Sequence, residues 1–244
     1  MNALTLRDLS GMPEFVQAEA LQHLVWGEDD SADPADLMMV IQHEGGLVAG
    51  AFEQDELIGY VFGFPTRDRS IQHSHRLAVS PSWRGRGLAL QLKHYQRRWC
   101  LERGIELVRW TFDPLRHINA HLNVCRLGVT ASTYLTDYYG AMKGINAGLS
   151  SDRLLAEWHL NSPRVIALAQ GSHVPLSTRE ASDSPSFTIK IPADLDALIA
   201  HDQVGAMAMR MQVREELIRH FTAGFCITDY DPLRFEYHLT KLVR

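Results

Sequence analysis

A glycine-rich turn flanked by arginines carries the clearest chemistry in the sequence. Residues 84–89 read Arg-Gly-Arg-Gly-Leu-Ala; they follow a β-like run that ends at residue 79 and precede an amphipathic helical pattern. A helix that begins at such a turn presents unpaired N–H groups at an electropositive end, and glycine lets a ligand approach the backbone closely. Arg84 and Arg86 add positive charge. The turn therefore predicts a binding site for an anion such as a diphosphate.

Two histidines lie on the run that leads into this turn. Residues 73–79 read His-Ser-His-Arg-Leu-Ala-Val. Regular strand alternation places four of these side chains on one face, those of His73, His75, Leu77 and Val79. An imidazole, with an ordinary pKa of about 6.5, is suited to take a proton from an amine. We therefore interpret His73 as the first candidate for a general base and His75 as the second; the alternative is that both histidines only pack or form hydrogen bonds within the strand.

The elements that position these residues follow from the apolar periodicity. The pattern predicts the order β-α-α-β-β-β-α-β up to residue 112, with strands at 46–53, 56–64 and 71–79 and a helix that begins after the turn. In this helix Leu88, Leu92 and Trp99 recur at helical spacing, which leaves Lys93 and Gln96 for solvent. The fold class is therefore α/β, in the broader α+β sense.

The remaining sequence predicts two further groups of elements. A short helix at 117–127 and strands at 133–138 and 154–160 complete the first group. Residues 161–186 form a connector rich in Ser, Pro and Gly, in which 165–168 is compatible with a short strand. A β-α-β-β extension at 187–244 follows, with one long helix at 193–222. We expect three segments, at 1–160, 161–186 and 187–244.

Composition excludes several function classes. The chain has 244 residues, 45% of them hydrophobic, and a net charge of -5, which argues against a general nucleic-acid binder. It contains no apolar run of membrane-spanning length and no signal-peptide pattern, so we expect a cytoplasmic protein without a membrane partner. Its three cysteines and twelve histidines show no metal-ligand spacing, so we expect no metal.

The turn is similar to the signature of one enzyme superfamily. It lacks the third glycine of the dinucleotide fingerprint, and the Walker A pattern is absent. It resembles the Arg/Gln-x-x-Gly-x-Gly/Ala motif of the GNAT acyltransferases at Arg84, Gly87 and Ala89, and the resemblance covers residues 1–160. It implies the GNAT fold, a mixed central sheet splayed at the acyl-CoA site. The implied CoA-binding residues are Leu77, Ala78, Val79, Arg84, Gly85, Arg86, Gly87, Leu88, Ala89, Asn119 and Asn123.

The His-x-His pattern resembles that of the arylalkylamine N-acetyltransferases, in which paired histidines assist proton removal. Many GNAT enzymes also have a tyrosine that protonates the leaving thiolate, but Val124 stands at the matching position here. The nearest tyrosines are Tyr134, Tyr138 and Tyr139, and each also fits a structural role. The general acid therefore stays unassigned.

Together these patterns predict an acyl-CoA-dependent N-acyltransferase that uses acetyl-CoA or another acyl-CoA and a small amine. An amino-acid acceptor would need a cation for its carboxylate, such as Arg153 or Arg116. A non-catalytic CoA-binding regulatory or sensor protein is the alternative, and an RNA-associated protein that uses the Arg-Gly turn is a third hypothesis that the charge disfavours. Exposed strand edges in the extension would allow a homodimer.

Overall fold

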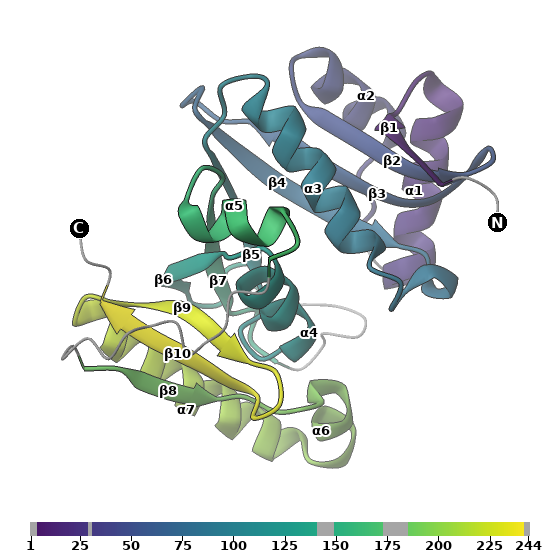
Figure 1. Cartoon of the computed structure of the whole chain (residues 1–244). Coiled ribbons are helices and arrows are strands. Elements are labelled where there is room, and N and C mark those ends of the chain that lie inside the picture. Colours follow the sequence, from purple (N-terminus) through teal and green to yellow (C-terminus); the bar gives the residue numbers. More distant parts are fainter. Residues whose placement is uncertain (1–3, 29–30, 141–148, 173–184, 242–244) are drawn as a thin grey trace. The chain divides into compact units, whose positions relative to one another are not determined.

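The computed structural model describes residues 4–28, 31–140, 149–172 and 185–241. The chain divides into two compact units, residues 1–109 and 110–244, which are described in turn (Figure 1). The predicted boundaries after residues 160 and 186 stay a prediction, and residues 173–184 of the predicted connector lie outside the described residues.

The first unit contains a mixed sheet. Its strands β1 (Leu4–Asp8), β2 (Leu47–Glu53), β3 (Glu56–Pro65) and β4 (Ile71–Val79) pair antiparallel in that order. Strand β5 (Leu107–Phe112), whose last residues belong to the second unit, adds parallel to β4. The predicted strand order of this half of the chain is confirmed.

Helices cover both faces of this sheet (Figure 1). Helices α1 (Met12–Trp26) and α2 (Ala35–His43) pack on one face, where Phe15 and Met38 join a core with Phe62 of β3. A short 3-10 turn, η1 (Pro81–Trp83), leads from β4 toward helix α3 (Leu88–Leu101), which lies on the opposite face. Gly59 allows this close approach, since a Cβ there would lie 3.2 Å from Leu92.

A β-bulge interrupts β4 at His75. Arg76 pairs with Phe62 and Ser74 pairs with Gly63, so His75 is an extra residue without a counterpart on β3. The predicted alternation is therefore wrong past this point. The rings of His73 and His75 both contact Phe64, whereas two other side chains point to the α3 face, those of Leu77 and Val79.

The second unit begins within β5 and continues with two short helical elements, α4 (His117–Ala120) and a π-helix η2 (His121–Arg126). Strand β6 (Thr130–Leu135) follows and belongs to the sheet of this unit. Strand β7 (Arg153–His159) pairs antiparallel with β6, and α5 (Pro163–Ala169) follows. Helix α5 occupies the segment that we considered for a short strand, because Ser162 caps its first turn and Pro163 sits in it.

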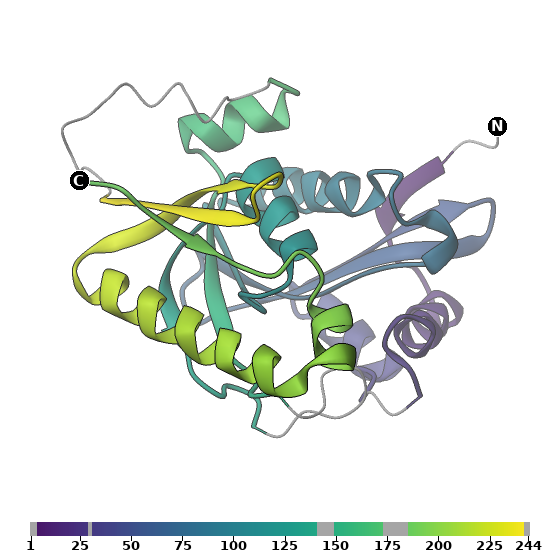
Figure 2. The same cartoon turned by 90° about the horizontal axis from the view of Figure 1, so that it is seen from below.

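The extension continues the sheet of the second unit in the order β7-β6-β9-β10-β8. Its elements are β8 (Phe187–Lys190), α6 (Leu195–His201), α7 (Gln203–Thr222), β9 (Phe225–Asp231) and β10 (Glu236–Lys241). The single helix predicted at 193–222 is wrong, because Asp202 ends α6 and caps α7 by accepting a hydrogen bond from the N–H of Gly205 at 2.8 Å. Helix α7 packs along β6, β8 and β9 (Figure 2).

Within the described ranges, no helix is both long enough and apolar enough to cross a bilayer.

Candidate active site

The turn before α3 has the backbone of an anion site. Gly85 and Gly87 have φ angles of 75° and 77°, in the left-handed region that glycine adopts at little cost. Gly87 is the N-cap of α3 and supplies no capping side chain. Arg84 and Arg86 are exposed beside it, and the Arg86 guanidinium lies 4.8 Å from the centre of the Trp83 ring. A bound anion would therefore meet both backbone donors and positive charge.

The backbone N–H groups of residues 85–90 are the main hydrogen-bond donors of this turn. The neighbouring Arg84 and Gln91 donate their N–H groups to backbone oxygens. Between them, no N–H group of residues 85–90 has an acceptor within the part of the chain that is described. Because α3 has 14 residues, its macrodipole adds to the positive potential at this end.

One edge of β4 next to this turn is open, in the sense that no strand of the first unit pairs with it in the described residues. The parallel register with β5 covers Ile71–His73 of β4 and ends there. The N–H of Ser80 bonds to Ile58 on β3, so by strand alternation the peptide groups of Leu77 and Val79 point to the opposite edge. Ala78 instead pairs with Tyr60 and is buried in the core. Leu77 and Val79 thus have the backbone orientation that the GNAT resemblance requires, and their role stays a prediction.

The two imidazoles lie on the other face of β4, at the bulge. The His73 ring stacks on Phe64 with centroids 4.9 Å apart, and the His75 ring lies 6.1 Å from that of His73. Burial lowers the pKa of His73 to about 4, with smaller contributions from nearby positive groups. His73 is therefore neutral at pH 7 and is a weak base.

A carboxylate that our sequence analysis missed accompanies His75. Asp33, in the connection between α1 and α2, places Oδ1 at 3.2 Å from Nε2 of His75 and Oδ2 at 2.9 Å from Nε of Arg76. Burial by itself would raise the pKa of Asp33, but the interactions with His75 and Arg76 outweigh it and lower this pKa. His75 is thus part of an acid–imidazole pair.

The opposite face of β4 holds a buried polar cluster on α3. Lys93 donates to Ser74 at 3.1 Å and to Gln96 at 2.7 Å, and Gln96 donates to Gln72 at 2.7 Å. Our assignment of Lys93 and Gln96 to solvent is wrong, since both are at most 2% exposed. Burial lowers the pKa of Lys93 to about 7, against a small opposing effect of Cys100.

An open groove adjoins the His73 side of the sheet. It provides about 320 Å³ and is lined by Val40, Ile41, Glu44, Phe64 and Pro65. Its walls are mostly apolar, and Phe64 connects it to the stacked His73 ring. A groove of this size can hold a small molecule.

The other predicted site residues belong to the second unit. Asn123 lies in the π-helix and is 5% exposed, whereas Asn119 precedes it in α4 and is half-buried. Val124, which the resemblance places at the position of a tyrosine acid, is fully buried.

The three candidate tyrosines differ in their surroundings. Tyr134 donates its hydroxyl to Asp152 at 2.6 Å, and burial with this hydrogen bond raises its pKa well above the ordinary value, which makes it a poor acid. Tyr138 and Tyr139 are each 52% exposed. The hydroxyl of Tyr139 lies 3.0 Å from that of Thr111.

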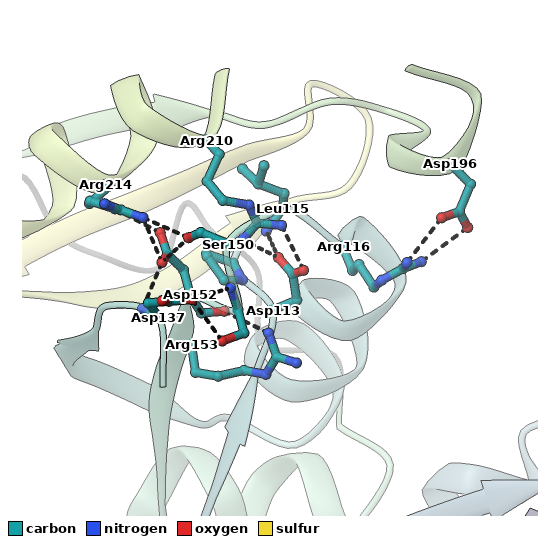
Figure 3. Close-up of polar contacts among 12 residues, drawn as sticks. Asp113, Leu115, Arg116, Asp137, Ser150, Asp152, Arg153, Asp196, Arg210 and Arg214 are labelled. Atoms are coloured by element: carbon teal, nitrogen blue, oxygen red, sulfur yellow. Dashed lines mark hydrogen bonds and ion pairs between the residues drawn. The ribbon is translucent and has the colours of Figure 1, made fainter. Parts of the chain in front are cut away.

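Ion pairs tie the extension to the rest of the second unit (Figure 3). From α7, Arg210 holds Asp113 with two nitrogens at 3.1 and 2.8 Å, and Arg214 contacts Asp152 with two nitrogens, each at 2.8 Å. Arg116, a candidate for binding an acceptor carboxylate, instead makes a bidentate pair with Asp196 of α6 at 2.9 and 3.0 Å. Across the described residues, no group of histidine, cysteine or acidic side chains has the arrangement of a metal site.

Known proteins show which fold and family this geometry matches. Residues 12–122 match the model of the Acetyltransferase (GNAT) family. No curated protein matches the sequence.

Solved structures match over about two thirds of the chain. The ribosomal-protein-S18-alanine N-acetyltransferase of Escherichia coli has a TM-score of 0.54 and 14% identity, covering 66% of this chain and 96% of its own. The aminoglycoside 6'-N-acetyltransferase of Enterococcus faecium has a TM-score of 0.52 and 16% identity, and the match covers 65% of this chain and 98% of its own. The yncA protein of Salmonella typhimurium has a TM-score of 0.53 and 16% identity, and the match covers 66% of this chain and 96% of its own. Its structure holds its cofactor acetyl-CoA. The predicted GNAT fold is confirmed.

Proposed function

Because residues 12–122 match the model of the acetyltransferase (GNAT) family, we propose that the protein is an acyl-CoA-dependent N-acyltransferase with a small-molecule amine as acceptor. Acetyl-CoA is the default donor. The observation that carries this proposal is the row of N–H groups at residues 85–90 that lack an acceptor in the described structure, next to the open edge of β4. The diphosphate of an acyl-CoA matches the N–H groups of residues 85–90. The amide-bearing arm that follows the diphosphate matches the open edge of β4.

In this proposal the turn from Arg84 to Ala89 binds the pyrophosphate of the acyl-CoA, and the open edge at Leu77 and Val79 binds its pantetheine arm. The amine attacks the thioester carbonyl, and the N–H of Val79 stabilises the charge that develops on the carbonyl oxygen. The nitrogen–carbon bond forms as the carbon–sulfur bond breaks. The amine loses a proton to the imidazole pair of His73 and His75, and the thiolate leaves and takes a proton from solvent.

The groove beside Phe64 supports a small acceptor. Its volume of about 320 Å³ suits a molecule of a few hundred daltons rather than a protein surface. Because Phe64 contacts both imidazoles, an amine bound in the groove would lie next to the groups that take its proton. This observation favours a small molecule over a protein acceptor.

A CoA-binding regulatory or sensor protein is the second candidate function. It is favoured by Val124, a buried apolar residue at the position where many GNAT enzymes have a tyrosine acid. Such a protein would bind CoA through the same turn without transferring an acyl group. Binding and turnover must therefore be measured separately.

Calorimetry with CoA tests the turn. Gly87→Val introduces a side chain at a residue with φ of 77°, and Gly104→Val is a matched control because its φ is 72° and a Cβ there also meets nothing within 4 Å. We expect Gly87→Val to weaken CoA binding about tenfold or more and Gly104→Val to leave it unchanged. Absence of CoA binding to the wild type would contradict both candidate functions.

Turnover then separates the enzyme from the regulator. CoA release from acetyl-CoA and succinyl-CoA is monitored with a panel of primary amines and amino acids. Release that depends on the amine supports the transferase. CoA binding without release across the whole panel supports the regulator.

A further inference from the structure

We propose that Asp33 is a positioning residue that orients the imidazole of His75, so that Nδ1 of this ring receives the proton of the acceptor amine. The inference rests on the proposed transfer function and refines its base. It assigns a role to a residue outside every motif of the sequence.

The backbone of Asp33 is fixed by a buried glutamine. Gln22 of α1 is fully buried, and its Oε1 accepts from the N–H of Asp33 at 2.7 Å while its Nε2 donates to the carbonyl of Asp33 at 3.2 Å. Both main-chain groups of one residue are thus held by one side chain in the core. Such a clamp restricts the carboxylate to a narrow set of positions.

The carboxylate then contacts two successive residues of β4. Oδ1 meets Nε2 of His75 at 3.2 Å, and Oδ2 meets Nε of Arg76 at 2.9 Å. Arg76 is itself held, since it donates to the carbonyl of Ser31 at 2.6 Å and lies 4.7 Å from the centre of the Trp26 ring. The bulge at His75 is what turns these two neighbouring side chains toward the same acid.

This arrangement selects one tautomer of His75. An ionised carboxylate only accepts hydrogen bonds, so Nε2 of His75 must carry the proton. Nδ1 then has a free lone pair, and within the described structure it has no hydrogen-bond partner. The side chain is 34% exposed, so part of the ring is accessible from solvent.

His73 is less suited to the same task. It is more deeply buried and stacked on Phe64, and its pKa falls to about 4. The charged or titratable groups on the same side of β4 as the pair include Asp33 from the α1–α2 connection and Arg76 from β4. Arg109 of β5 and Lys93, on the opposite face of β4, act on His73 through their charge. The elements that pack against His75 from β3 contribute uncharged rings, those of Phe62 and Phe64.

A double-mutant cycle tests whether Asp33 acts through His75. The variants are Asp33→Asn, His75→Gln and the double variant, with Asp36→Asn as a matched control because Asp36 is an exposed acid three residues away. The readout is kcat for CoA release from acetyl-CoA with ethanolamine, phenethylamine or putrescine as the probe amine. Asp33→Asn keeps the shape of the side chain and both main-chain bonds to Gln22.

We expect Asp33→Asn to lower kcat about tenfold or more in the wild-type background and less than about twofold in the His75→Gln background. CoA affinity should not change in any variant. Equal losses of kcat in both backgrounds would mean that Asp33 acts only through the structure of the α1–α2 connection, and this would overturn the proposal. The control Asp36→Asn should behave as the wild type.

A second measurement does not depend on turnover. The Nε2 proton of His75 should give a downfield, slowly exchanging NMR resonance that disappears in His75→Gln and moves upfield in Asp33→Asn. A wild type that lacks this resonance overturns the positioning role even if the protein transfers acyl groups. If the resonance is present but the protein transfers no acyl group, the Asp33–His75 hydrogen bond is supported and the proposed transferase function is contradicted.

Discussion

The polar groups around α7 and those around β4 differ in how many of their hydrogen-bonding atoms have partners within the protein. Around α7, Arg210 and Arg214 each bind a carboxylate with two nitrogens, and Ser150 donates a further hydrogen bond to Asp152. Around β4, the described structure provides no acceptor for the N–H groups of residues 85–90 and no partner for Nδ1 of His75. The first, closed cluster pairs its carboxylates internally, and of its guanidinium nitrogens Nε of Arg210 is buried without a hydrogen-bond partner in the described structure. The second, open cluster leaves N–H groups and a ring nitrogen without a protein partner among the described residues.

The difference separates a structural role from a chemical one. A buried ion pair has already lost its hydration, so removing one partner leaves an uncompensated charge. Groups that face a binding site keep access to water or to a ligand, so their substitution should change binding or rate more than stability.

The largest effect is expected for Arg210→Met. Arg210 is 1% exposed and holds the nearly buried Asp113, which also accepts from the N–H of Leu115 at 2.9 Å. Without the guanidinium, the Asp113 carboxylate remains buried and unpaired, and we expect a loss of about 3–5 kcal/mol in the free energy of unfolding. Urea denaturation at pH 7 measures this loss.

Arg210→Lys provides the control for Arg210→Met. It keeps the charge and loses the bidentate geometry, so its loss should be smaller. A free energy of unfolding for Arg210→Met within about 1 kcal/mol of the wild type would contradict the structural role of the Arg210–Asp113 pair.

The open cluster could be predicted in large part from the sequence, because its information is local. The glycines and arginines of residues 84–89 act through backbone conformation and charge that a few neighbouring residues determine. The strand before them and the helix after them follow from periodicity, and β4 (Ile71–Val79) has the predicted bounds. The bulge at His75 was not predicted, since it depends on how β4 pairs with β3.

The closed cluster could not be predicted, because its partners are far apart in the chain. Arg210 and Asp113 are separated by 97 residues, and Arg214 and Asp152 by 62. Asp33 escaped for the same reason, since it contacts His75 over 42 residues. Lys93 was misassigned because a charged residue between helical apolar positions is normally exposed. A single buried lysine leaves no signal in the periodicity.

Lys93 links the two kinds of cluster, because it is buried but titrates near neutrality. Its pKa is about 7 in the folded protein, whereas an unfolded lysine has a pKa of about 10.4. Between these values the unfolded state binds more protons, so the stability of the wild type rises with pH in this window. Lys93→Met lacks this contribution. From pH 7.5 to 9.5 we expect the wild type to gain about 2 kcal/mol relative to Lys93→Met.

Arg98→Met is the control for Lys93→Met. It removes an exposed cation from the same helix and leaves the buried Lys93 in place. Urea denaturation at the two pH values measures each difference. If the stabilities of the wild type and Lys93→Met change in parallel with pH, Lys93 is not the titrating group.

The smallest effect is expected for Asp196→Asn. This variant tests whether an exposed bidentate ion pair stabilises the fold as much as the buried pairs of the closed cluster do. Asp196 makes a bidentate pair with Arg116, as Asp113 does with Arg210, but its side chain is 61% exposed. Solvent screens this pair, so we expect a loss below about 1 kcal/mol that shrinks further at 1 M NaCl. A loss as large as that of Arg210→Met would mean that bidentate geometry, and not burial, determines the energy of these pairs.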